Sequence, residues 1–96
     1  MIRVDGQRLY VTGPATLATA AQLLEAARAP LAGGVREIDL GEVTEVDSSL
    51  LAVLFAWMRE AKERKQALAL ARLPADLKSL AQLYGVAELL PQETAS

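Results

Sequence analysis

The chain contains 96 residues, of which 52% are hydrophobic, and it carries a formal net charge of −2. This length accommodates one hydrophobic core, and the apolar content is too high for a disordered chain. The sequence has no Cys and no His, which excludes the usual zinc and iron sites, thiol nucleophiles and serine hydrolases with an imidazole base. Lys and Arg are scattered along the chain, so no nucleic-acid-binding surface is expected.

The chain is predicted to begin with a β-hairpin. Residues 2–4 and 9–11 alternate apolar and polar side chains and flank Asp5-Gly6. Gly adopts a positive φ at little cost, so Asp-Gly between two such runs is typical of a tight hairpin turn. Gly13-Pro14 is expected to end the second strand.

A helix is predicted to follow the hairpin. Thr16 or Thr19 can cap its start, and it should reach about residue 29. Pro30 and Gly33-Gly34 are expected to end it. The residues spaced along one face of this helix are Leu17, Ala20, Leu24 and Ala27.

The second half of the chain is predicted to alternate strands and helices. Residues 35–40 are expected to form a buried strand, which ends in a short acidic turn before a helix that runs from near Asp47 to about residue 64. Residues 67–71 favour another strand. A last helix is predicted from about Pro74 to Tyr84, with Gly85 as a left-handed C-cap, then a short helical turn at 87–90. Residues 92–96 are expected to be a flexible tail.

The predicted order is therefore ββαβαβα, which is an α/β fold. We expect one domain over residues 1–91, with a mixed, mostly parallel sheet of about four strands and helices packed on it. The longest uncharged apolar segment, residues 50–58, is far shorter than the roughly 20 residues that span a bilayer. A soluble protein without direct membrane insertion is expected.

The helix after Asp47 is predicted to have two distinct surfaces besides the one that faces solvent. At about 100° per residue, Leu50, Leu54, Trp57 and Ala61 fall in one narrow sector, which should face the sheet. A neighbouring flank combines a large aromatic side chain with hydroxyl and cationic groups. This arrangement is more typical of a protein-binding surface, in which polar groups surround an apolar anchor residue, than of a surface that contacts only water. Its members are Ser48, Leu51, Phe55, Arg59 and Lys62. The alternative is that Phe55 packs under a neighbouring helix.

Asp47 and Ser48 stand where a helix cap is expected. Asp47 is the better candidate for the cap, which would leave the Ser48 hydroxyl at the first helical position and partly free. A phosphate on Ser48 would be stabilised by the helix N-terminus and would add about two negative charges beside any bound partner. Ser48 is thus a candidate phosphorylation site.

No catalytic, metal or cofactor site is predicted. The acidic residues that crowd the turn before Asp47 are explained by solvation and capping rather than by general acid–base catalysis. The sequence contains no P-loop and no Gly-rich nucleotide fingerprint. A hydrolase that uses Ser48 would need Lys62 as its base, nearly four helical turns away.

The order of elements and the Asp47-Ser48-Ser49 step, which six residues separate from Ile38-Asp39-Leu40, resemble the STAS domain family. Residues 73–86, with their Leu-Ala-Gln-Leu-Tyr-Gly-Val core, are similar to the MlaB subgroup. This resemblance implies a non-enzymatic cytoplasmic subunit, peripheral to the inner membrane, that binds the ATPase of an ABC phospholipid-transport complex and supports outer-membrane lipid asymmetry. It also implies that Asp47, Ser48 and the adjoining helix flank face the ATPase.

The alternative within the STAS family is an anti-sigma-factor antagonist that binds a kinase and is switched by phosphorylation of Ser48. Two departures disfavour it. Those antagonists usually have Gly where Leu50 stands, and they have a Gly-x-Leu-Asp pattern where this chain has Gly13-Pro14-Ala15-Thr16.

Overall fold

The computed structural model describes residues 1–90, and the predicted tail at 92–96 lies outside these residues. The elements follow one another in the order β1 (Ile2–Asp5), β2 (Arg8–Ala15), α1 (Leu17–Ala26), α2 (Arg28–Ala32), β3 (Glu37–Val46), α3 (Ser48–Glu63), β4 (Ala69–Ala71), α4 (Ala75–Leu83) and the short 3-10 helix η1 (Ala87–Leu89).

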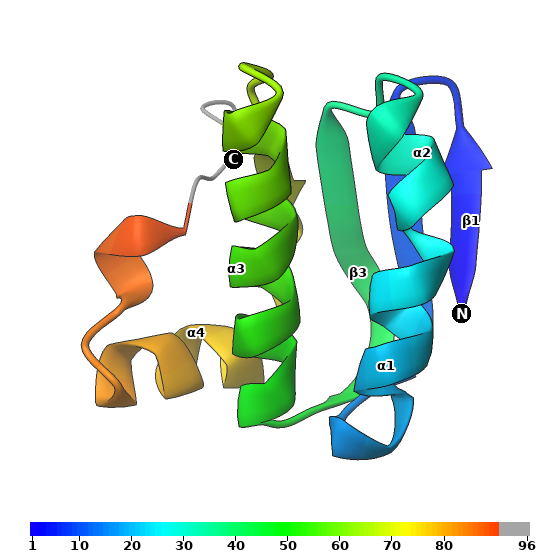
Figure 1. Ribbon diagram of the computed structural model, residues 1–96. Coiled ribbons are helices and arrows are strands. Elements are labelled where there is room, and N and C mark those ends of the chain that lie inside the picture. The colour runs from blue at the N-terminus through cyan, green and yellow to red at the C-terminus, as the bar shows by residue number, and fades with distance from the viewer. Residues whose placement is uncertain (91–96) are drawn as a thin grey trace.

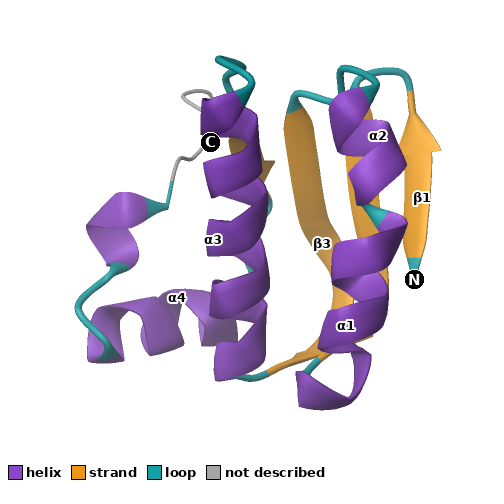
Figure 2. Ribbon diagram, viewed as in Figure 1, coloured by secondary structure: helices purple, strands orange, loops and turns teal. Residues whose placement is uncertain are grey.

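The four strands form one sheet in the order β1-β2-β3-β4. β1 and β2 are antiparallel, whereas β2 pairs with β3 and β3 with β4 in parallel. Figures 1 and 2 show α1, α2 and α3 in front of this sheet, with α4 beside the lower half of α3. The predicted α/β class and the mixed, mostly parallel sheet are confirmed.

The core lies between the sheet and the helices, and α3 contributes the most buried residues to it. Alternate residues of β2 and the centre of β3 point toward the helices, as the two-residue period of a strand requires. On the helix side, the predicted sector of α3 is buried, with Leu54 fully inaccessible and Trp57 only 1% exposed. The largest buried side chains from the strands are Leu9, Val11, Ile38, Leu40 and Leu70.

The prediction that Gly13-Pro14 ends the second strand is wrong, because β2 continues to Ala15. The parallel pairing with β3 shifts register between Gly13 and Pro14, and Gly13 has a φ of 78°. A bulge of this kind lets a strand pass a residue that has no N–H for the ladder. The predicted acidic turn after residue 40 is likewise part of β3, which pairs with this extension of β2 as far as Val46.

The first helix also differs from its prediction. It breaks at Ala27 into α1 and α2, and Pro30 lies inside the first turn of α2, where its missing N–H is not needed. Leu17 is 77% exposed and Leu24 is 37% exposed, so the predicted apolar face is incorrect in part. Leu23 is buried instead, together with Ala27. The last strand is shorter than the predicted 67–71, since only Ala69–Ala71 pair with β3.

Candidate docking site

Asp47 closes the N-terminus of α3 and also holds α1 in place. One carboxylate oxygen, Oδ1, accepts a hydrogen bond of 2.8 Å from the Ser49 backbone N–H, as an N-cap does. The other oxygen, Oδ2, accepts a bond of 3.0 Å from the backbone N–H of Leu17, the first residue of α1. The Leu17 hydrogen bond, with a further contribution from Ser49, lowers the pKa of Asp47. Asp47 therefore caps α3 with one oxygen and connects it to the start of α1 with the other.

The predicted flank of α3 divides into a buried part and an accessible part. Ser48 is the first residue of the helix and is exposed. Phe55, two turns further along, is only half-buried and packs against the edge of the core. Leu51 differs from the expectation of a surface residue, because it is only 5% exposed and belongs to the core.

These three residues line a mostly apolar groove of about 400 Å³. α3 supplies one wall and the floor, and the turn after α4 supplies the other wall. The lining residues are Ser48, Leu51, Ala52, Phe55, Tyr84 and Val86. Because Tyr84 is 57% exposed and Phe55 is half-buried, two aromatic rings from distant parts of the chain stand at the surface of one depression.

Gly85 fixes the wall that Tyr84 and Val86 form. It follows the last residues of α4 with a φ of 71°, a left-handed conformation that Gly adopts without strain. The Val86 N–H donates to the Ala81 carbonyl (2.8 Å) and the Gly85 N–H to the Gln82 carbonyl (3.1 Å). This is a Schellman motif, and it confirms the predicted C-cap. The sequence pattern did not indicate that this turn would lie against α3.

Arg59 and Lys62 continue the same flank toward the C-terminal end of α3. Both are exposed and neither lines the groove. Among residues 1–90, neither side chain forms an ion pair, whereas Arg3, Arg8, Arg28 and Arg72 all do. Of the six predicted partner-binding residues, the structure thus brings three together in the groove, places two beyond it and gives Asp47 a capping role.

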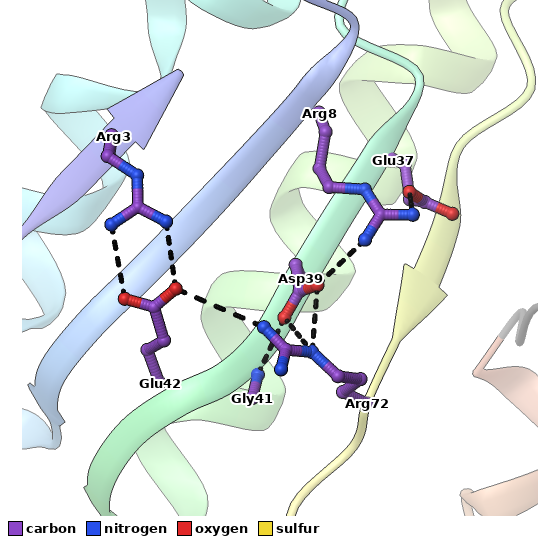
Figure 3. Close-up of polar contacts among 7 residues, drawn as sticks. All are labelled: Arg3, Arg8, Glu37, Asp39, Gly41, Glu42 and Arg72. Carbon is purple, nitrogen blue, oxygen red and sulfur yellow. Dashed lines mark hydrogen bonds and ion pairs between the residues drawn. The ribbon is translucent and has the colours of Figure 1, made fainter. Parts of the chain in front are cut away.

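A second cluster of charged residues, missed by the sequence analysis, lies on the sheet face opposite the helices and centres on Asp39 (Figure 3). Asp39 is fully buried, and its carboxylate accepts bonds from Arg72 Nε at 2.8 and 2.9 Å and from Arg8 Nη1 at 3.0 Å. The Gly41 N–H donates a further bond of 2.8 Å. The Arg72 guanidinium lies so close to Gly41 that a Cβ there would stand 2.4 Å from Arg72 Cζ. A side chain at position 41 would therefore displace the Arg72 guanidinium from its present place.

The same cluster extends to both sides of Asp39. Glu42 accepts two bonds from the Arg3 guanidinium, at 3.2 and 2.8 Å, and Arg8 also pairs with Glu37. Each carboxylate is engaged by an arginine, so its oxygens are not free to accept a proton from a substrate. The arrangement connects β1, β2, β3 and the residue after β4, so we assign it a structural role.

A larger apolar hollow, of about 490 Å³, lies between β1 and the helices α1 and α2. Its polar lining residues are Thr19 and Gln22, and the Thr19 hydroxyl already donates to the Pro14 carbonyl. This hollow contains no aromatic side chain and none of the predicted partner-binding residues, so the groove beside α3 remains the candidate site. Its apolar wall residues are Met1, Ile2, Val4, Leu23, Ala26 and Pro30.

Two further properties bear on the class of protein. Within residues 1–90, no group of three or more acidic side chains is arranged to hold a metal ion. None of the helices in the same part of the chain combines the length and the apolar character needed to cross a bilayer.

The family model described as "Mlab, STAS domain" matches residues 2–91, almost the whole chain. The chain belongs to the STAS domain family. No curated protein sequence matches this STAS domain. The matched family is one of protein-interaction modules, and no enzyme family is indicated.

Solved structures with the same fold include known regulators. The anti-sigma factor antagonist SpoIIAA in its unphosphorylated form is 14% identical, with a TM-score of 0.72, and the match covers 98% of this STAS domain and 87% of that chain. A candidate anti-sigma factor antagonist from Thermotoga maritima is 13% identical (TM-score 0.74; 96% and 83% covered). The phosphorylated form of the Bacillus cell fate determinant SpoIIAA is 15% identical (TM-score 0.66; 98% and 90% covered). These likenesses establish the STAS fold.

Proposed function

We propose that this STAS domain is a non-enzymatic subunit that binds the ATPase of an ABC phospholipid-transport complex and supports its assembly and activity. In this role residues 1–91 act as one domain at the cytoplasmic face of the inner membrane, held there by the ATPase, and the complex maintains outer-membrane lipid asymmetry. The MlaB-type family model and the Leu-Ala-Gln-Leu-Tyr-Gly-Val segment support the assignment.

The observation that carries the proposal is the groove beside α3. It presents an apolar floor, two partly exposed aromatic rings and the exposed Ser48 at the start of α3. Apolar pockets that contain aromatic anchors and have a polar rim are typical of protein-binding surfaces. The partner-binding set is then Ser48, Leu51, Phe55, Arg59 and Lys62, with Asp47 positioning the first turn of α3.

The proposal is tested with the ABC ATPase subunit from the same organism and two variants in the groove. Phe55→Asp should weaken binding at least about 30-fold, because buried aromatic anchors contribute 2 kcal/mol or more to an interface. Ser48→Glu should weaken it as well. This second variant guards against misfolding, since Ser48 is exposed and a carboxylate is favourable at a helix N-terminus.

The matched control is Val4→Asp, which adds the same charge to an exposed apolar position on the distant edge strand β1. It should bind like the wild type in size-exclusion chromatography and in titration calorimetry. Circular dichroism establishes that each variant is folded. Wild-type affinity in both folded groove variants would contradict the docking role of this surface.

A second candidate function is that of an anti-sigma-factor antagonist regulated at Ser48. The fold shared with SpoIIAA and the exposed hydroxyl at the first turn of α3 favour it. In that case, incubation with the anti-sigma kinase of the same organism and ATP should add one phosphate to the intact chain. The Ser48→Ala variant should remain unmodified.

A further inference from the structure

The cations of α3 lie closer to the aromatic anchor of the groove than its acidic residues do. At about 100° per residue, Arg59 and Lys62 lie roughly 40° and 20° from Phe55 around the helix. Glu63 lies about 80° from Phe55 and Glu60 about 140°. The charges of α3 nearest to Phe55 are thus positive.

Neither cation forms an ion pair with any acidic residue of the described chain, residues 1–90. The three arginines of the sheet face are each held by a carboxylate, whereas within the described residues neither Arg59 nor Lys62 lies within 4.0 Å of an acidic oxygen. A solitary exposed Arg or Lys is ordinary. Here both stand in line with an apolar groove, one and two helical turns beyond its aromatic anchor, so they form the charged rim of that site.

We propose that the groove accepts an acidic amphipathic segment of the ATPase. A bulky apolar side chain of this segment fills the space between Phe55 and Tyr84, and carboxylates further along it face Arg59 and Lys62. With a rise of 1.5 Å per residue, the two cations lie roughly 6 and 10 Å from Phe55 along the axis of α3. The carboxylates should therefore follow the apolar anchor at about these spacings.

This inference rests on the proposed function, and it makes a separate prediction about ionic strength. Charges on the rim of an interface act mainly through the association rate and its salt dependence, whereas the anchor determines the dissociation rate. Raising the ionic strength from about 0.02 to 0.5 M shortens the Debye length from roughly 20 Å to about 4 Å, so the rim attraction should fade while the apolar contact remains.

The test is the double variant Arg59→Glu/Lys62→Glu, titrated against the ABC ATPase subunit by stopped-flow and calorimetry at low and high salt. The association rate at low salt should fall at least tenfold, and the salt dependence should disappear or change sign. The control is Arg28→Glu/Arg36→Glu, which makes the same change in net charge at exposed positions outside the groove. It should keep most of the wild-type rate and its salt dependence.

The outcomes separate the two proposals. If the double variant binds with the wild-type rate and salt dependence while Phe55→Asp abolishes binding, the acidic segment is ruled out and the docking function stands. An equal effect of the control pair would also rule it out, because net charge alone would then explain the result. If the wild-type chain does not bind the ATPase at all, the proposed function fails and this inference fails with it.

Discussion

Asp39 is a buried charge on an otherwise solvated sheet face. It is the one charged residue that is fully buried within residues 1–90. An isolated carboxylate in that position would be strongly unfavourable, and the two arginines together with the Gly41 N–H compensate for its loss of hydration. The side chains of Arg8 and Arg72 are 37% and 55% exposed, so Asp39 is the one residue of the three that is fully removed from solvent.

This difference in solvent exposure between Asp39 and its arginine partners determines how much stability should be lost when Asp39 is removed. Breaking a fully buried pair costs about 3–5 kcal/mol, because the remaining charge is stranded. Here the arginines can return to solvent, so Asp39→Ala should lower the free energy of unfolding by about 2 kcal/mol, in line with lost hydrogen bonds to a charged group. The measurement is urea unfolding at pH 7. Glu42→Ala, which removes an exposed pair, should lower it by less than about 1 kcal/mol. Equal losses would contradict this account.

Asp47 makes the stability of the protein depend on pH in the acid range. Its pKa is lowered in the folded state by the Leu17 and Ser49 hydrogen bonds. A lowered pKa contributes stability above the unfolded value, about 3.9, and this contribution is lost as the pH falls through the folded pKa. Between about pH 5 and 2, the wild type should therefore lose more stability than Asp47→Asn. Urea unfolding at a series of pH values measures the difference, and parallel curves would contradict it.

At the scale of elements, the turn after α4 determines the shape of the groove. Gly85→Ala places a side chain at a φ of 71°, which should destabilise the protein by about 1 kcal/mol and displace Tyr84 and Val86. The affinity for the proposed ATPase partner should fall as well. Gly85→Asn is the matched control, because Asn tolerates the left-handed conformation better, and it should retain more of both stability and affinity. Thermal unfolding and calorimetry measure the two effects.

The existence and type of the elements could be predicted from the sequence, whereas several boundaries could not. The buried sector of α3 and the cap at Asp47 follow from helical periodicity and local chemistry. The lengths of β2 and β3 do not, because residues 41–46 form a strand only when the end of β2 pairs beside them. The break between α1 and α2 at Ala27 likewise depends on tertiary packing, which the local sequence pattern does not indicate.

The same distinction applies to the candidate site. Helical spacing alone puts Ser48, Phe55 and Arg59 on one flank. Tyr84 lies 29 residues beyond Phe55 in the sequence, so its place in the groove depends on how α4 packs against α3. The contact between Asp39 and Arg72 spans 33 residues and requires a left-handed φ of 53° at Arg72, which sequence patterns do not indicate for Arg.

The whole molecule has two unlike sides. The helix side carries the groove and several exposed apolar side chains, among them Leu17, Leu83 and Tyr84. The sheet side is closed by paired charges and by Tyr10, whose ring lies 4.3 Å from the Arg3 guanidinium carbon. Charged groups that are already paired within the protein offer few free contacts to a binding partner. The helix side is therefore the better surface for protein binding.

The hairpin turn at Gly6-Gln7 connects β1 and β2 at the sheet edge far from α3 and α4 (Figure 1). Tight surface turns tolerate inserted sequence better than packed elements do. A fluorophore, an affinity handle or a fused reporter could therefore be attached there without crowding the groove beside α3.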